Sequence, residues 1–368
     1  MDIEVVFIGT KFLYNKPLRE YALRNIEKSF KYPVGIKFYK DNENSLFLEL
    51  EKIISSKNFV ILISSRQNYP TIGKIISTIT EDNLVLKENS LIPSKAEIYE
   101  ERSYLLNYEQ TFINVIELDE TKKMPSILLN IENESAVMQL FGEDESSAKI
   151  LLDTLSDTYD VKLEFVTLID GWLEIHIKSK KHGDISKFIS SAKQLLPKKI
   201  IPSSNIASYI IERLSSLNKT VTFAESCTGG LLTYFFTKQN GASNILNGSL
   251  VTYANHIKSN WLAVDEEALK TYGAVSSIVV EQMSEGAMGV SGADYAISIS
   301  GIAGDSGGTV EKPVGTVFIG IRTKNKHFEE HIFLKGDRNY IQYQSVLYAI
   351  KILLFSDIET FFKQIKEN

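Results

Sequence analysis

Two patterns of apolar residues alternate along the first part of the chain. Apolar runs at residues 3–8 and 59–63 are typical of strands buried on both faces, and a shorter run at 35–39 predicts another strand. Between them, residues 18–30 and 45–55 carry apolar side chains at helical spacing. Strands that alternate with helices predict a parallel, doubly wound sheet.

The pattern changes from Met124 onward. A hairpin-type turn is predicted at Asp170-Gly171 between two strands, with one helix before the hairpin and one after it. These elements predict a small βαββα module of the α+β class, and Pro197 and Pro202 indicate a linker that follows it. The elements of the module are expected at residues 126–131, 145–159, 161–167, 172–178 and 185–196.

In the last part of the chain, strands again alternate with helices, which predicts a second α/β domain. The final two strands are expected to form an antiparallel pair, and a long helix closes the domain. Strands are expected at residues 220–223, 249–253, 294–300, 316–322 and 327–333, and helices at 205–217, 231–236, 266–272, 278–288 and 340–355. We therefore expect three domains, at residues 1–123, 124–198 and 203–368.

Composition narrows the class of protein. The 368 residues carry a formal net charge of −6, which disfavours a broad nucleic-acid surface, and the lysines near His182 lack the interleaved aromatic residues of a stacking platform. The single cysteine excludes an intrachain disulfide framework and a cysteine-cluster metal site. The first residues do not resemble a signal peptide, and no apolar run approaches the ~20 residues of a membrane helix. We expect a soluble cytoplasmic protein.

Three polar loops, at residues 224–230, 253–258 and 300–309, each follow a predicted strand. In an open α/β sheet such loops converge on one crevice at the carboxyl edge of the strands. The first leads into a helix, whose start favours an anion or a developing oxyanion. The glycines of the third let backbone N–H groups approach a phosphate. Viewed alone, the first loop is more commonly an ordinary helix cap, and a mobile glycine turn explains the third loop equally well.

The loops contain the groups for nucleophilic catalysis. Ser226 is the candidate nucleophile, although among the histidines only His256 falls in a candidate loop. Lys258 could deprotonate Ser226 if burial lowers its pKa, and Tyr253 could relay a proton. The alternatives are a surface lysine that begins a helix, a tyrosine in the core, and Cys227 as a rival nucleophile or as a small apolar packing residue. Nearby carboxylates match no standard metal-ligand spacing: Glu225, Asp294 and Asp305.

A series of motifs in the last domain has a recognisable order. It runs through Ala224-Glu225-Ser226-Cys227-Thr228-Gly229-Gly230, Val251-Thr252-Tyr253-Ala254-Asn255 with Lys258, Gly273-Ala274-Val275-Ser276, and Ser300-Gly301-Ile302-Ala303-Gly304 with Gly307-Gly308-Thr309 and Lys312-Pro313-Val314-Gly315-Thr316. This series resembles the carboxy-terminal α/β/α domain of the CinA family. The resemblance implies a nicotinamide mononucleotide amidohydrolase, which releases ammonia and leaves nicotinic acid mononucleotide for NAD salvage.

The resemblance also implies roles for individual residues. Ser226 would be the nucleophile, Lys258 its base and Tyr253 a supporting proton relay. No metal or cofactor is implied, the partner is a small nucleotide substrate, and a homodimer is expected. The residues expected to bind substrate are Thr228, Gly229, Gly230, Ser300, Gly301, Gly304, Gly307, Gly308 and Arg338.

Two positions depart from the family pattern. Asp305 follows Gly304 where the family usually has proline, which places a negative charge near the expected phosphate site. Gln342 stands where the family has a second arginine after Gly336-Asp337-Arg338. The alternative function is therefore a non-catalytic, nucleotide-binding regulatory protein associated with competence or DNA damage.

The first domain resembles the molybdopterin-binding-type domain of the same family, which in some members is a metal-dependent ADP-ribose pyrophosphatase. The loop expected at residues 64–74 has Gly73-Lys74 where the family has two aspartates. Without carboxylates a Mg²⁺ site does not form in that loop, so we expect this activity to be lost. Arg66 and Lys74 could hold an anion or belong to a solvated basic loop. The middle module resembles the family's KH-like module, without its Gly-x-x-Gly loop.

Overall fold

The computed structural model describes residues 3–30, 35–87, 90–129, 135–304 and 307–363. The chain divides into two compact units, residues 1–133 and residues 134–368. Within the described residues, no helix combines the length and the apolar character needed to cross a bilayer.

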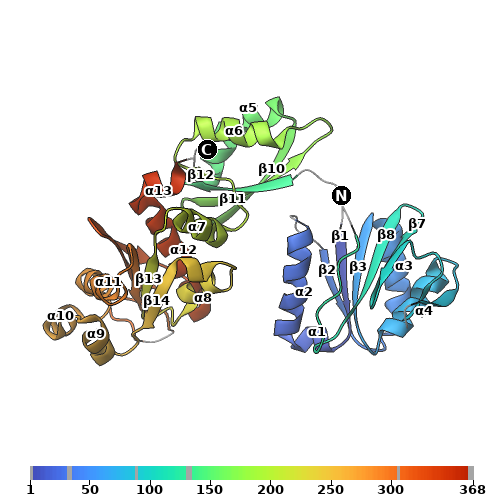
Figure 1. The fold of residues 1–368 in the computed structure, drawn as a ribbon, viewed down its shortest axis with the longest axis horizontal. Helices are drawn as coiled ribbons and strands as arrows, with labels where there is room; N and C mark the ends of the chain where they lie inside the picture. Colours follow the sequence, from blue (N-terminus) through green and yellow to red (C-terminus); the bar gives the residue numbers. More distant parts are fainter. Residues whose placement is uncertain (1–2, 31–34, 88–89, 130–134, 305–306, 364–368) are drawn as a thin grey trace. The chain divides into compact units, whose positions relative to one another are not determined.

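The first unit contains a six-stranded sheet in the order β2-β1-β3-β8-β7-β6. β1 is parallel to β2 and β3, and β3 is parallel to β8, as predicted, while β7 and β6 continue the sheet antiparallel. Figure 1 shows α2 on one side of this sheet and α3 and α4 on the other, and each side has its own apolar core. The elements are β1 (Ile3–Ile8), α1 (Lys11–Tyr14), α2 (Lys16–Ser29), β2 (Gly35–Tyr39), α3 (Leu46–Ser56), β3 (Phe59–Ser65), α4 (Tyr69–Ile79), β4 (Leu84–Lys87), β5 (Ser90–Pro93), β6 (Ile98–Glu100), β7 (Ser103–Tyr108) and β8 (Thr111–Leu118).

Two predictions for this region are wrong. The loop was expected to reach Lys74, but it ends at Tyr69, where α4 begins. Residues from Tyr69 onward form a helix because Tyr69, Ile72 and Ile76 lie on one face that is buried in the core. Residues 126–129 do not form the predicted strand. Instead, Leu129 and the preceding Met124 pack into the core beneath α2. The rest of that predicted strand lies outside the described residues.

The second unit begins with the small module, a four-stranded sheet in the order β10-β11-β9-β12. The predicted order of elements is confirmed, although the first strand lies at Ser135–Phe141. Asp144 and Asp184 cap the two helices by accepting hydrogen bonds from backbone N–H groups in their first turns. The elements are β9 (Ser135–Phe141), α5 (Glu145–Thr158), β10 (Val161–Ile169), β11 (Trp172–Ser179), α6 (Ile185–Leu195) and β12 (Ile200–Ile201).

The module shares an apolar core with the domain that follows it. The ring of Phe141 lies 5.0 Å from that of Trp172, and it makes edge contacts with Phe355 and Phe362 at 6.3 and 5.8 Å. All four side chains belong to, or pack against, the core of the last domain. The two parts of this unit are therefore joined by packing as well as by the chain.

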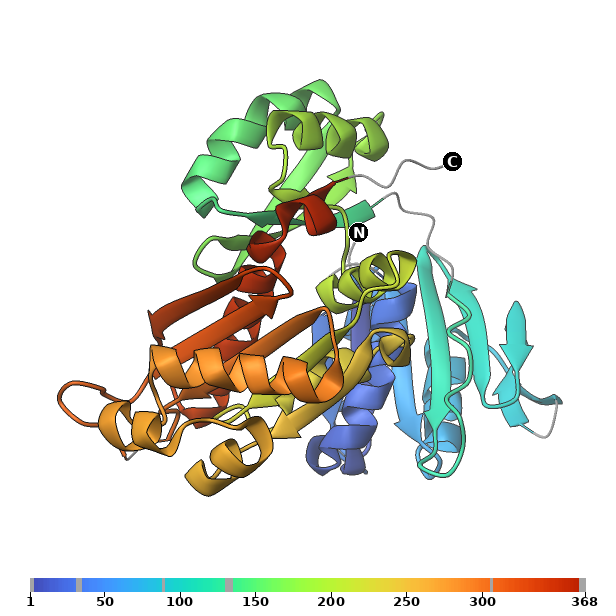
Figure 2. The same cartoon turned by 60° about the vertical axis from the view of Figure 1, so that its left-hand side comes forward.

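The last domain is a five-stranded sheet in the order β14-β13-β15-β16-β17, with β13 parallel to both neighbours and β16 and β17 antiparallel. One core lies between the sheet and α7, α8 and α12, and another lies beneath α9, α10 and α11. Figure 2 shows α11, in orange, across one face of the sheet. The elements are α7 (Ile206–Ser216), β13 (Val221–Glu225), α8 (Leu231–Thr237), β14 (Leu246–Val251), α9 (Asn255–Leu262), α10 (Glu266–Tyr272), α11 (Ser277–Ser291), β15 (Tyr295–Gly301), β16 (Thr316–Thr323), β17 (His327–Phe333), α12 (Arg338–Ser356) and α13 (Ile358–Phe362). The predicted α/β class is confirmed.

Candidate active site

A short turn between β13 and α8 carries Ser226. β13 lies between β14 and β15, and the N–H of Ser226 donates to Ile299 of β15 at 2.9 Å, so the strand pairing continues to the serine. Gly229 and Gly230 both have positive φ angles, of 59° and 101°, which side chains rarely adopt. Glycine is therefore required at both positions, because the chain turns sharply there before it enters α8.

Lys258 reaches this turn from the first turn of α9. Its side chain is almost fully buried, and its Nζ lies 3.0 Å from the Oγ of Ser226. The same Nζ donates to the carbonyl oxygens of Thr252 and Tyr253 at 2.7 and 3.0 Å. Burial disfavours the charged amine and lowers the pKa of Lys258 to about 8.

The three contacts of Lys258 determine what the amine can do. A protonated amine has three N–H bonds, one for each acceptor around Nζ. When it loses a proton, the two carbonyl groups still accept the remaining N–H bonds. The lone pair is then directed at the third partner, Ser226. A neutral Lys258 is thus arranged to take the hydroxyl proton of Ser226.

A pocket of about 260 Å³ opens beside these two residues. It is lined by seven of the residues predicted to act in catalysis or to bind substrate and by five others, of which three belong to the polar loops and two to the segment before α11. The predicted residues are Ser226, Tyr253, Lys258, Ser300, Gly301, Gly304 and Arg338, and the neighbours are Cys227, Ala274, Val275, Ile302 and Ala303. The predicted convergence of the three polar loops is therefore present.

The third loop contributes shape to this pocket. A Cβ on Gly301 would lie 2.8 Å from Val317 and 3.1 Å from the Sγ of Cys227, so only glycine fits there. The hydroxyl of Ser300 is buried and donates to the carbonyl of Ala274 at 2.7 Å. Ser300 thus ties the third loop to the segment before α11.

Several of the predicted substrate-binding residues do not line the pocket. The hydroxyl of Thr228 is buried and donates to Glu225 at 2.7 Å, and the N–H of Gly230 donates to the same carboxylate at 3.0 Å. Gly308 packs against the backbone of Pro313 and Val314. The residues outside the lining are Thr228, Gly229, Gly230, Gly307 and Gly308. Asp305 lies outside the described residues.

Two side chains of α12 contact the site one helical turn apart. Arg338 donates to the hydroxyl of Tyr253 at 2.7 Å, and the Nε2 of Gln342 donates to the carbonyl of Cys227 at 2.5 Å. Tyr253 is more exposed than expected for a residue of the core, with 59% of its surface accessible. In the described residues its hydroxyl has no hydrogen bond to Ser226 or Lys258.

Comparison with known proteins identifies the family. Residues 203–356 match the family model described as the CinA C-terminal domain. A CinA-like protein of Prochlorococcus marinus (strain AS9601) is 36% identical over 236 residues, which cover 61% of this chain and 56% of that protein. The crystal structure of a competence/damage inducible protein from Agrobacterium tumefaciens shares 36% identity, covers 41% of this chain and 92% of its own, and superposes with a TM-score of 0.40. The chain belongs to the CinA family.

The CinA C-terminal domain contains every residue that lines the pocket. A putative competence-damage inducible protein of Thermoanaerobacter sp. (strain X514) aligns more widely, at 29% identity over 358 residues, 94% of this chain and 78% of that protein. The chain spans about half the length of other curated relatives, including the Prochlorococcus protein.

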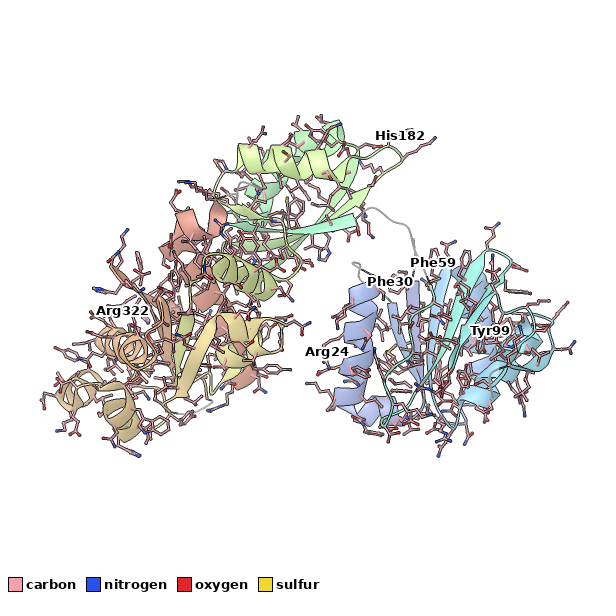
Figure 3. All side chains as sticks on the ribbon, viewed as in Figure 1. Arg24, Phe30, Phe59, Tyr99, His182 and Arg322 are labelled. Carbon is pink, nitrogen blue, oxygen red and sulfur yellow. The ribbon has the colours of Figure 1, made fainter. Side chains whose placement is uncertain are left out.

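Outside the pocket, one group of three side chains in the described ranges has its potential metal-ligand atoms close together: Glu281, His327 and Glu329. The Nε2 of His327 lies 3.5 Å from Glu281 and 3.9 Å from Glu329. Arg322, labelled in Figure 3, already contacts Glu281 at 3.5 Å and supplies a positive charge to the group. None of the three lines the pocket.

The first unit has a pocket of its own, of about 280 Å³, at the carboxyl ends of its parallel strands. The segments after β2 and β8 bring Asp41, Asp119 and Glu120 to Arg66, and these acids were not predicted from the loop after β3 alone. These acids already have partners within the protein: Asp41 accepts from Asn68 at 2.6 Å, and Glu120 pairs with Lys11 at 3.0 Å. The residues around this pocket are Lys11, Asp41, Ser65, Arg66, Gln67, Asp119 and Glu120.

Proposed function

We propose that the CinA C-terminal domain hydrolyses the carboxamide of nicotinamide mononucleotide, giving nicotinic acid mononucleotide and ammonia for NAD salvage. The observation that carries the proposal is the 3.0 Å contact between the Oγ of Ser226 and the Nζ of a buried Lys258 at the wall of a pocket. The motif resemblance implies the substrate, and the geometry supports Ser226 as the nucleophile and Lys258 as the base.

The reaction begins with neutral Lys258. Its amine takes the hydroxyl proton as the Oγ of Ser226 attacks the amide carbon, which gives a tetrahedral oxyanion. The resulting ammonium then protonates the departing nitrogen, the C–N bond breaks, and ammonia leaves an acyl-serine. Water attacks this ester while Lys258 accepts its proton, and the proton returns to Oγ as the carboxylate product is released.

Two backbone N–H groups beside Ser226 support a site for the oxyanion. The N–H groups of Cys227 and Thr228 donate no hydrogen bond to another residue within the described part of the chain, although both residues are buried. Unpaired buried N–H groups are uncommon, and a ligand oxygen is one partner that satisfies them. Both follow the nucleophile directly, as donors of an oxyanion hole commonly do.

Arg338 supports a phosphate-bearing substrate. Among the described residues that line the pocket, only Arg338 and Lys258 are basic, and none is acidic. Because Lys258 is committed to Ser226 and two carbonyl groups, Arg338 is the group that remains for an anion. Its planar guanidinium suits a phosphate.

Ammonia release from nicotinamide mononucleotide by the full-length protein, without added metal, tests this function. We expect turnover in the wild type and a loss of at least ~10³ in kcat in Ser226→Ala. Ser259→Ala is a matched control next to Lys258 in α9, because the hydroxyl of Ser259 is buried and has no partner in the described residues. An inactive wild type, or an undiminished rate in Ser226→Ala, would refute the proposal.

The second candidate is a nucleotide-binding regulatory protein without turnover. It is favoured by Gln342, which stands at the position of an arginine in the family, donates to the carbonyl of Cys227, and is not among the described residues that line the pocket. Tight nucleotide binding in calorimetry with no ammonia release would support it. For the first unit we keep the expectation that pyrophosphatase activity is lost, and ADP-ribose cleavage that survives Ser226→Ala would contradict it.

A further inference from the structure

The residue before the nucleophile is a fully buried carboxylate. Glu225 ends β13 with no exposed surface, and its hydrogen-bond donors are two threonine hydroxyls and three backbone N–H groups of the turn and of α8. One carboxylate oxygen accepts from Thr228 Oγ1 (2.7 Å), Gly230 N (3.0 Å) and Leu232 N (3.0 Å), and the other from Thr233 N (2.8 Å) and Thr233 Oγ1 (2.5 Å). None of these donors is a lysine or arginine side chain.

This arrangement replaces an ordinary helix cap. Burying a carboxylate is costly unless it is well hydrogen-bonded, and the donors at a helix start together with the helix dipole offset that cost. The residue at the N-cap of α8 is Gly230, which has no side chain to cap the helix. Glu225 therefore caps α8 from the preceding strand, across the turn that holds Ser226.

The cap decides which N–H groups of the turn stay available. The N–H groups of Gly230, Leu232 and Thr233 all donate to Glu225, so the start of α8 cannot bind the substrate anion as the sequence suggested. Among the described residues, the N–H groups of Cys227 and Thr228 have no partner in another residue. The hydroxyl of Thr228 is also fixed by Glu225, which limits how the peptide before it can rotate.

We propose that Glu225 is a positioning residue that sets the geometry of the nucleophile turn. Glu225 does not line the pocket, so it acts through Ser226 and the two unpaired N–H groups. The inference rests on the proposed function in one respect, the role of Ser226 as the nucleophile.

Glu225→Gln tests this role. Glutamine keeps the shape of the side chain but presents an NH₂ group where one carboxylate oxygen accepts N–H and O–H donors, so one side of the cap is lost. The rate at which a fluorophosphonate probe labels Ser226 reports the nucleophile whatever the true substrate is. We expect labelling and kcat to fall by about 10²-fold, the effect of a small misplacement of a reacting group, with KM little changed.

Two further measurements separate positioning from general damage. The pH midpoint of labelling should stay at the wild-type value, because Glu225 is not a hydrogen-bond partner of Lys258. Asp265→Asn is the matched control: Asp265 caps α10 in the same domain by accepting from the N–H of Glu267, and its loss should leave labelling unchanged.

The outcomes are distinct. A folded Glu225→Gln that labels at the wild-type rate overturns the proposal, and so does a shift of the pH midpoint that accounts for the whole loss. If circular dichroism shows that Glu225→Gln is unfolded, the Thr228→Val variant tests the proposal instead. Labelling that is about tenfold slower, from the loss of one charge-assisted hydrogen bond, supports the positioning role of Glu225, and an unchanged rate refutes it. A wild type that labels at Ser226 but releases no ammonia refutes the proposed substrate and leaves this test intact.

Discussion

At the scale of single residues, Lys258 makes the site sensitive to pH. Burial lowers its pKa to about 8, and only the neutral amine can accept the proton of Ser226. We expect kcat/KM to rise about tenfold per pH unit below this value and to level off above it. A pH–rate profile between about pH 6 and pH 10 measures the midpoint.

The control for this profile is Lys258→Arg, which keeps a positive charge that is not lost in this range. It should be almost inactive at every pH. A wild-type profile that is flat, or that has its midpoint at the ordinary lysine value of 10.5, would contradict the assignment of Lys258 as the base.

The role of Tyr253, in substrate binding or in proton transfer, can be tested by a variant that removes only its hydroxyl. Because that hydroxyl accepts from Arg338, we expect Tyr253→Phe to raise KM for the mononucleotide about tenfold and to leave kcat nearly unchanged. Steady-state kinetics separates the two constants. A large fall in kcat would instead favour the proton relay implied by the family resemblance, and Tyr234→Phe, at an exposed tyrosine of α8, is the control.

The sequence predicts some of these residues and misses others for a physical reason. Ser226 and Lys258 were found because each belongs to a loop that follows a strand, and parallel strands bring such loops to one edge of the sheet. The contacts of Glu225 and Gln342 were not predicted, since they join a side chain to backbone groups of another element. Such contacts leave no periodic pattern in the sequence from which they could be predicted.

At the scale of elements, α12 connects the two halves of the site. Arg338 contacts the segment that carries Tyr253, and Gln342 holds the carbonyl of Cys227 in the nucleophile turn. We expect Gln342→Ala to lower kcat by about fivefold, the effect of losing one hydrogen bond of about 1 kcal/mol.

Gln344→Ala is the matched control for α12. Gln344 lies two residues further along the same helix and donates to the carbonyl of Lys335, away from the pocket lining. Equal kinetic losses in both variants would show that the helix as a whole was disturbed, and would contradict a specific role of Gln342.

Element boundaries were predicted well where the apolar period is strong and poorly where packing competes with it. The predicted strand at 126–131 was inferred from local composition, yet Met124 and Leu129 are buried in an irregular segment against α2. The predicted loop after β3 ended early because α4 starts at Tyr69. In both places the conformation depends on packing against elements that are distant in the sequence, and a short stretch of sequence does not show that packing.

At the scale of the whole molecule, the small module and the last domain should unfold together. Phe141 lies in the core they share, so we expect Phe141→Ala to destabilise the second unit by about 3–5 kcal/mol in one cooperative transition. Urea denaturation followed by the fluorescence of buried Trp172 measures this, in a Trp261→Phe background that removes the exposed tryptophan.

Leu195→Ala serves as the control for Phe141, because Leu195 belongs to the same module and is half exposed. It should change the stability by less than about 0.5 kcal/mol. A Phe141→Ala variant that loses the module first, in a separate transition, would contradict the shared core.

The single thiol gives the site one more property. Cys227 follows Ser226 in the chain and lines the same pocket, but burial raises the pKa of its thiol to about 12. Oxidants and alkylating agents attack the thiolate, which is scarce at neutral pH under these conditions. Peroxide or iodoacetamide should therefore spare a centre that uses the serine, and the reaction should run at the same rate in reducing and in oxidising surroundings.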